Sequence, residues 1–121
     1  MMTETWYLLF NDKKELMGPP LPVEAKTIGG LMIAIKKEYT KELENVNAHH
    51  LVIWQCKQPT LLATEEENKL QEHLLKINFD NRDQIVKLTS GTDLADLKLG
   101  KKEILLVQVP GLLPFLSLLR H

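Results

Sequence analysis

The sequence has one cysteine, Cys56, and therefore cannot form a disulfide within the chain. Small secreted domains often use disulfides, so this composition fits a reducing compartment, or a protein that leaves one cell and works inside another. No stretch approaches the roughly 20 consecutive apolar residues that a membrane-spanning helix needs. Basic residues are not in excess, since 15 Lys and Arg stand against 16 Asp and Glu and the net charge is -1. Because nucleic-acid-binding proteins usually carry a basic face, we expect no nucleic-acid partner and no membrane span.

We expect no secretory leader at the N-terminus and no membrane anchor at the C-terminus. Residues 1–14 (MMTETWYLLFNDKK) have no positively charged leader, and their apolar run is too short for the core of a secretory signal. Residues 111–121 (GLLPFLSLLRH) are apolar but short, and they contain Pro114. We interpret them as a tail that docks on the domain, is disordered or begins a linker, and that offers one route to a homodimer.

What the sequence does contain is typical of one globular α+β domain, which we place at residues 1–110. Apolar residues are 44% and charged residues 26% of the 121, close to average values. Strands are predicted at residues 5–10, 21–26, 50–56, 85–88 and 104–109, and helices at 27–43 and 65–77, with a helical turn or loop at 92–99. The strand at 21–26 follows a proline-rich loop, so we expect it at a sheet edge or in a hairpin. The strand at 50–56 is apolar on both faces, which is typical of a strand in mid-sheet.

The first predicted helix, TIGGLMIAIKKEYTKEL, has two glycines where it should begin. Thr27 can cap it with its hydroxyl. Its apolar stripe is formed by Ile28, Leu31, Ile35, Tyr39 and Leu43. Gly29 and Gly30 each cost about 1 kcal/mol against alanine. Close packing of the helix start onto a sheet is the simpler reason for them. A phosphate-binding loop is the alternative, although the wider glycine spacing and the Lys-Ser/Thr ending of such loops are missing.

The second predicted helix carries a capping-box pattern. Thr64 is expected to cap it, with Glu67 three residues later, and Leu70, Leu74 and Ile77 form its apolar stripe. The run Glu65 to Glu67 is most simply a favourable acidic cluster at a helix N-terminus.

The order of these elements favours a ubiquitin-like β-grasp. Two N-terminal strands can form a hairpin, a crossover helix follows, and a later strand returns, with the last strand beside the first. The main helix would then cover one face of a small mixed sheet. The alternatives are a ferredoxin-like α+β sandwich, with two helices on one face of its sheet, and an irregular α+β domain.

Three stretches, TIGGLMIAIKKEY, HHLVIWQC and LADLKLGKKEILLVQVP, together resemble the N-terminal domain of Crinkler proteins. In that family a helix opens with a Val-Gly or Ile-Gly pair, a strand ends in Leu-x-Leu-Trp or Leu-x-Leu-Phe, and a closing strand ends in Val-Gln-Val-Pro. The positions that match this pattern are Ile28, Gly29, Leu31, Ile35, Leu51, Ile53, Val107, Val109 and Pro110. The Leu-Phe-Leu-Ala-Lys stretch of oomycete members is replaced by LVIWQCK, so the resemblance is closer to the fungal branch.

The resemblance implies a non-enzymatic, ubiquitin-like N-terminal header of a secreted effector. Such a domain would serve trafficking into host cells or protein contacts, and the protein would be found in the extracellular region or in a host cell. The alternative is a stand-alone ubiquitin-like adaptor or modifier in the cytoplasm of the producing cell. A conjugated modifier ends in Gly-Gly, whereas this chain ends in Leu119-Arg120-His121.

Residue types that could carry chemistry are not spaced for it. His50 and Cys56 lie on one predicted strand and would be about 20 Å apart, because a strand rises about 3.3 Å per residue. That separation excludes one shared metal ion and a direct proton transfer. A role for His49 or His73 would need the fold to bring it to Cys56. We therefore predict no catalytic residue, metal or cofactor, and we expect Cys56 to be a buried apolar residue.

Val52 and Trp54 form the candidate protein-binding patch. They share the strand face opposite to Leu51 and Ile53. One of these two faces must look away from the main helix, and in a ubiquitin-like fold that side often carries the binding patch. An exposed aromatic residue beside an aliphatic one is a frequent binding hot spot. The alternative is that Trp54 belongs to the core. The partner expected here is a protein of unknown identity.

Overall fold

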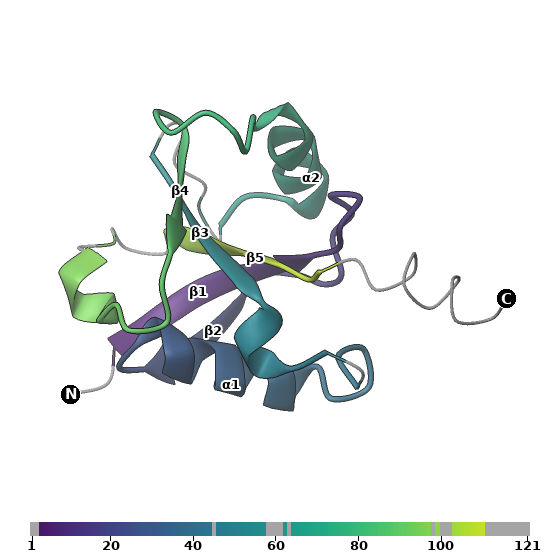
Figure 1. Cartoon of the computed structure of the whole chain (residues 1–121). Coiled ribbons are helices and arrows are strands. Elements are labelled where there is room, and N and C mark those ends of the chain that lie inside the picture. Colours follow the sequence, from purple (N-terminus) through teal and green to yellow (C-terminus); the bar gives the residue numbers. More distant parts are fainter. Residues whose placement is uncertain are drawn as a thin grey trace, which may run out of the picture.

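The computed structural model describes residues 3–44, 46–57, 62, 64–97, 99 and 103–110. The chain is an α+β protein with a mixed sheet and two helices (Figure 1). Its elements are β1 (Thr3–Phe10), β2 (Leu21–Ala25), α1 (Ile28–Glu38), η1 (Ala48–His50), β3 (Val52–Cys56), α2 (Glu67–Lys76), β4 (Ile85–Leu88), η2 (Leu94–Leu97) and β5 (Ile104–Gln108). The predicted tail at 111–121, with its suggested role in a homodimer, lies outside the described residues.

The sheet has the strand order β2-β1-β5-β3-β4. β1 pairs with β2 in antiparallel and with β5 in parallel orientation, as Leu8 opposite Leu106 illustrates. β5 and β4 both pair antiparallel to β3. The predictions that the last strand lies beside the first, that 21–26 forms an edge strand and that 50–56 lies inside the sheet are confirmed. This arrangement is compatible with a β-grasp-like fold.

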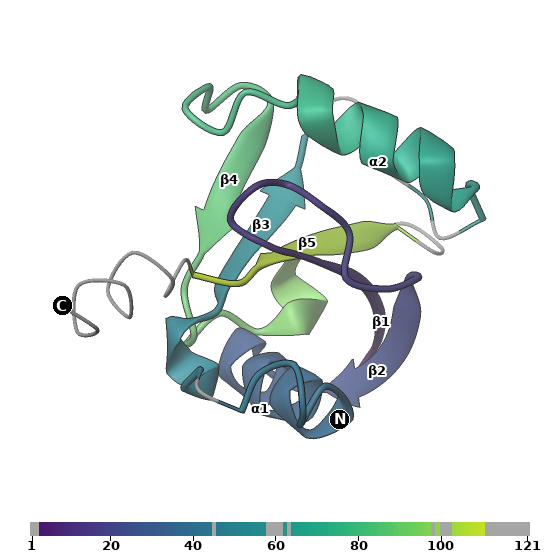
Figure 2. The same ribbon diagram turned by 90° about the vertical axis from the view of Figure 1, so that its right-hand side faces the viewer.

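The two helices cover opposite faces of the sheet, as Figures 1 and 2 show. The α1-side core includes Tyr7, Leu9, Ile28, Leu31, Ile35, Tyr39, Leu43, Leu51, Ile53, Leu105, Val107 and Val109. The α2-side core consists of Leu8, Phe10, Cys56, Leu70, Leu74, Ile77, Ile85, Ile104 and Leu106. A ferredoxin-like sandwich would place both helices on one face, so this alternative is wrong. The expectation of one main helix across the sheet is incomplete, because α2 forms a second layer.

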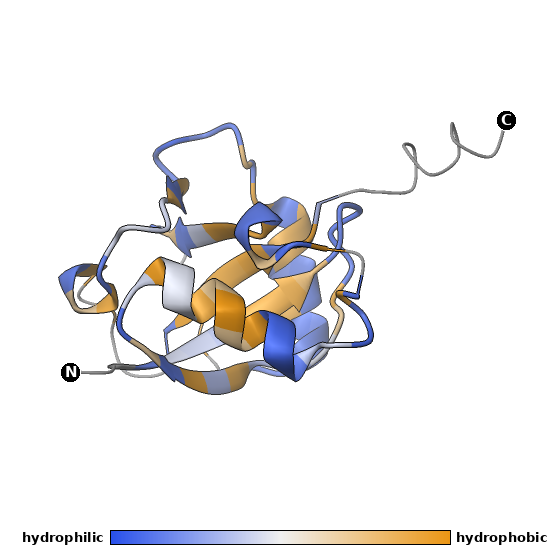
Figure 3. Cartoon of the chain, turned by 60° about the horizontal axis from the view of Figure 1, so that its bottom comes forward, coloured by the Kyte–Doolittle hydropathy of each residue, from blue (hydrophilic) through white to orange (hydrophobic). Residues whose placement is uncertain are grey.

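Two-sided burial explains the apolar runs in the sequence. Strands buried on both faces carry continuous rather than alternating apolar residues, and in β5 residues 104–107 are all buried. Coloured by hydropathy, the central strands are largely hydrophobic while the surrounding loops are largely hydrophilic (Figure 3). The centre of the sheet therefore supplies one wall to each of the two cores.

Helix α1 begins as predicted. Thr27 is its N-cap, and the Thr27 hydroxyl accepts a hydrogen bond of 3.1 Å from the Gly30 amide. The Leu31 amide donates to the Thr27 carbonyl at 3.0 Å. The first bond satisfies one of the amides that a helix N-terminus leaves open, and the second is the first regular backbone hydrogen bond of the helix.

The loop after β4 satisfies two more of the open amides. The Ile28 amide donates to the Thr92 carbonyl and the Gly29 amide to the Ser90 carbonyl, both at 2.9 Å. The amides of residues 28, 29 and 30 are thus all bonded within the chain, so none of these three is left for a phosphate. The close-packing interpretation holds for Gly29, but its packing partner is the loop at Ser90 rather than the sheet.

The two glycines should respond differently to alanine. A Cβ at Gly29 would lie 3.2 Å from the Ser90 carbonyl oxygen, whereas at Gly30 its nearest neighbour is 3.6 Å away. Gly30→Ala should therefore raise the free energy of unfolding by about 0.5–1 kcal/mol through helix propensity. In Gly29→Ala the same gain is opposed by displacement of the Ser90 carbonyl, which also accepts the residue 29 amide. We expect Gly29→Ala to be neutral or destabilising in urea unfolding, and equal gains for both variants would contradict close packing against Ser90.

Three predicted boundaries are wrong. α1 ends at Glu38 rather than near residue 43, because the Tyr39 backbone leaves helical geometry and the Thr40 hydroxyl donates to the Lys37 carbonyl at 2.7 Å. β3 starts at Val52, since 48–50 form the short helix η1. The capping box at Thr64 is not formed: α2 starts at Glu67, and its N-cap, Glu66, makes no side-chain cap bond. The predicted stripe of α2 is confirmed by the burial of Leu70, Leu74 and Ile77.

Candidate protein-binding groove

The residues that could have carried chemistry are dispersed. His49 and His50 are exposed in η1, while Cys56 is buried at the far end of β3. His73 lies in α2 and is half-buried. Among the described residues, no group of three His, Cys, Asp or Glu side chains could hold a metal ion. The fold thus gives these side chains no shared site.

Cys56 behaves as a core residue. It packs in the α2-side core, and burial, followed by the nearby Glu103 carboxylate, raises the pKa of its thiol to about 12. A thiol with this pKa stays protonated at neutral pH, and the thiolate is the reactive form. The predicted burial of Cys56 is confirmed.

The positions of the family resemblance lie mainly in one layer. Seven of them belong to the α1-side core: Ile28, Leu31, Ile35, Leu51, Ile53, Val107 and Val109. Gly29 makes the close approach to Ser90, and Pro110 is half-buried just after β5. These positions therefore determine packing around α1.

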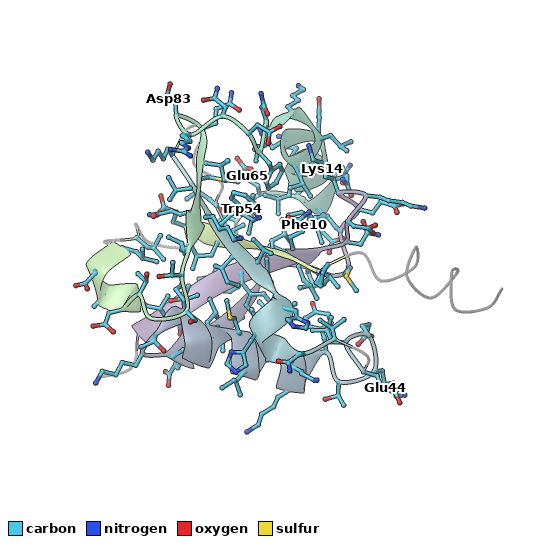
Figure 4. All side chains as sticks on the ribbon, in the orientation of Figure 1. Phe10, Lys14, Glu44, Trp54, Glu65 and Asp83 are labelled. Carbon is cyan, nitrogen blue, oxygen red and sulfur yellow. The ribbon has the colours of Figure 1, made fainter. Side chains whose placement is uncertain are left out.

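Trp54 lies on the sheet face opposite α1, on the side of α2. It is half-buried against the α2-side core. Its ring meets Phe79 edge-on at a centroid distance of 5.1 Å, and its indole N–H donates to Gln108 Oε1 at 3.2 Å. Figure 4 shows Trp54, Phe10 and Lys14 on the α2 side of the sheet. Trp54 thus joins the core at one edge and leaves part of its ring at the surface.

A groove of about 570 Å³ opens beside Trp54. Trp54, Phe79 and Ile85 supply its apolar and aromatic surface, and Lys57, Arg82 and Lys87 are exposed at its rim. Val86 and Asp80 complete the lining. Val52 is half-buried and is not among the lining residues, so the structure places Trp54 with Phe79 rather than with Val52.

Strand register and one loop assemble this groove. Lys87 is directly opposite Trp54 and Ile85 is opposite Cys56 in the β3–β4 pair, so all four side chains point to the same face. The loop between α2 and β4 is held by its own hydrogen bonds, including Asn78 N–H to Gln84 Oε1 at 3.0 Å.

Lys14 braces Phe79 from the loop that follows β1. Its ammonium lies 4.8 Å from the centroid of the Phe79 ring and donates to the Ile77 carbonyl at 3.2 Å. A cation over an aromatic face is a favourable contact. Phe79 also stacks at 5.7 Å from Phe10. The aromatic wall of the groove is thus fixed from three sides.

The lining of the groove holds three cations and one carboxylate, and therefore an excess of positive charge. Lys57, Arg82 and Lys87 face a single lining carboxylate, Asp80. In the part of the chain that the structure describes, the ion pair within 4 Å joins Lys76 to Glu72, on α2. The rim cations are therefore available to a ligand, and their combined field favours an anionic one.

Sequence reasoning found Trp54 but missed the rest of the groove. Phe79 stands in the turn FDNRD, and a large aromatic residue in a polar turn was the one available signal. Lys57 is 25 residues before Arg82 and 30 before Lys87, and the pairing of β3 with β4 brings it beside them. No described helix is long and apolar enough to cross a bilayer. No protein-family model and no curated protein matches this chain.

Proposed function

We propose that the chain is a ubiquitin-like β-grasp domain that works by binding protein, as the non-enzymatic N-terminal domain of a Crinkler-type secreted effector. The observation that carries the fold is the strand order β2-β1-β5-β3-β4, with α1 crossing between the N-terminal hairpin and the sheet interior. This is the order expected of a β-grasp. The resemblance in three stretches supports the family, and its apolar positions match the α1-side core.

Binding rather than catalysis is supported by the surface. The described histidines and the cysteine are scattered, and the groove beside Trp54 combines aromatic surface with cations that have no ion-pair partner among the described residues. Aromatic residues with Arg are the side chains that dominate protein-binding hot spots. In this proposal α1 and β5 hold the fold, and the β3–β4 end of the sheet meets the partner.

The effector role is tested by tagging the gene in the source organism and following the native product. We expect a polypeptide larger than the 13.9 kDa of this chain, recovered from the culture medium or from host tissue. A product of 13.9 kDa that stays inside the producing cell would contradict the effector role and support the stand-alone adaptor. Adducts joined to other proteins through the C-terminus would instead identify a conjugated modifier.

A further inference from the structure

We propose that the groove beside Trp54 binds an extended acidic segment of a partner protein, which places an apolar or aromatic side chain against Trp54 and Phe79. The inference rests on the proposed protein-binding function and specifies the chemistry of the partner. It is carried by three features of the described residues: the aromatic floor, the unpaired rim cations and the position of the groove at a sheet edge.

The floor selects for an apolar anchor. Trp54 and Phe79 meet edge-on and leave part of each ring accessible, since both residues are half-buried. Ile85, which is buried beside them, continues the apolar surface. A side chain that fills this space would remove aromatic surface from water, and such burial is worth roughly 25 cal/mol per Å².

The rim selects for negative charge. Lys57 follows β3, Lys87 lies in β4 and Arg82 lies in the loop before β4, so the three cations approach the floor from different elements. None of them has a carboxylate within ion-pair distance among the described residues. Asp80 is the one acidic residue in the lining. Acidic residues on both sides of the anchor would therefore complement the rim.

The edge position favours an extended segment. β4 is the outer strand of the sheet on this side. The groove is lined by Ile85, Val86 and Lys87 in succession, although successive side chains of a strand point to opposite faces. It therefore reaches the backbone of β4. The Lys57 amide donates to the Gln84 carbonyl at 2.7 Å, so residues 57 and 84 form a hydrogen-bonded pair. Hydrogen-bonded and non-hydrogen-bonded pairs alternate along an antiparallel ladder, which makes Trp54 and Lys87 a non-hydrogen-bonded pair. The backbone N–H and C=O of Lys87 therefore point away from β3. A partner strand can pair there.

Two other anionic partners fit less well. A nucleic acid would need a wide basic surface, whereas Asp80 and Asp83 lie in the loop that carries Arg82, and the net charge is -1. An anionic bilayer presents a broad surface, whereas the aromatic residues here line a concave groove. An acidic peptide matches both the shape and the limited number of cations.

The test is a selection of short random peptides displayed on phage, with the full chain as bait. We expect the selected peptides to be enriched in Asp and Glu flanking an aromatic or large aliphatic residue. One synthetic peptide from this pool is then titrated against variants and against rising salt. Lys57→Glu/Lys87→Glu should weaken its binding at least about tenfold, and Trp54→Ala roughly thirtyfold. Higher ionic strength should weaken it further, because the rim charges are exposed.

The matched control is Lys37→Glu/Lys41→Glu. These lysines are exposed on α1 and in the turn after it, and the change in net charge is the same. We expect binding to change less than about twofold, because screening limits charge effects over such distances. In NMR spectra of the unmodified chain titrated with the same peptide, the chemical shifts of the backbone amides should change most for residues 85–87. Since the four lysines are exposed, both double variants should fold, and binding loss in the first cannot be ascribed to unfolding.

Several results would overturn the proposal. One is a selected pool without acidic enrichment, and another is equal loss of binding in the two double variants. A third is binding of phosphatidylserine vesicles or of a single-stranded oligonucleotide by a chain that ignores the peptides. This test is separate from that of the effector role, because peptide binding at the groove is compatible with either location of the native protein.

Discussion

Leu106→Ala and Leu105→Ala should each lower the free energy of unfolding by about 2–5 kcal/mol. The two residues are neighbours on β5, and both side chains are fully buried. They point in opposite directions, because Leu106 belongs to the α2-side core and Leu105 to the α1-side core. Each substitution leaves a cavity in a different layer. Chemical denaturation of the purified chain measures both.

The control for this pair is Leu75→Ala. Leu75 lies on α2 but is 58% exposed, so its loss should cost less than about 0.5 kcal/mol. If Leu106→Ala cost no more than Leu75→Ala, α2 would not form a packed layer, and the groove beside it would lose its support. If Leu105→Ala were strongly destabilising and Leu106→Ala were not, the α1-side core would be packed and the α2-side core would not.

The second large effect is a loss of stability in alkaline solution. Burial, with Tyr39 and Glu38 as further causes, raises the pKa of Tyr7, and burial also raises the pKa of Tyr39. The pKa of Cys56 rises to about 12. Each of these groups binds its proton more tightly in the folded state, so its stabilising effect is complete below the unfolded pKa. The effect is lost as pH rises from the unfolded towards the folded pKa.

We therefore expect the free energy of unfolding to fall above about pH 9, where unfolded cysteine and then tyrosine ionise. The slope should approach about 1.4 kcal/mol per pH unit for each group that titrates only on unfolding. The chain has just two tyrosines, so phenolate absorbance reports on Tyr7 and Tyr39 alone. Tyr39→Phe should reduce the slope. Phenolate formation near pH 10 without unfolding would contradict the burial of these rings.

The sequence predicted the elements that obey a local period. The stripe of α1 and the runs of β1 and β5 could be read directly, because apolar residues recur at helix spacing in the first and without interruption in the others. Thr27 could be identified as a cap from its own chemistry. The last strand was placed beside the first by the order of elements alone.

The errors have a common physical cause. The ends of α1 and α2 depend on competition between backbone and side-chain hydrogen bonds, as at Thr40, and propensity does not decide that competition. The second layer could not be inferred because a stripe on α2 does not say which face of the sheet it covers. The groove depends on the register that places Lys87 opposite Trp54, and register is a long-range property.

The resemblance and the groove concern different parts of the molecule. Positions such as Ile35 and Val107 are fully buried, so they report on the packing of the α1-side core. Arg82 and Lys87 are exposed and would be free to differ between members with different partners. We therefore expect relatives to share the α1-side core and to vary at the groove.

Site-specific photo-crosslinking tests most directly whether the β3–β4 end of the sheet binds protein. A photoreactive amino acid replaces Asp83, which is exposed in the loop beside the groove but does not line it, or Lys37 on α1, in the complete native protein within its own cellular setting. We expect a discrete protein adduct from position 83, absent from position 37, whose crosslinked peptide is acidic. If position 83 gave no adduct, or the same adducts as position 37, the groove would not be the binding surface and the proposed mode of action would be wrong.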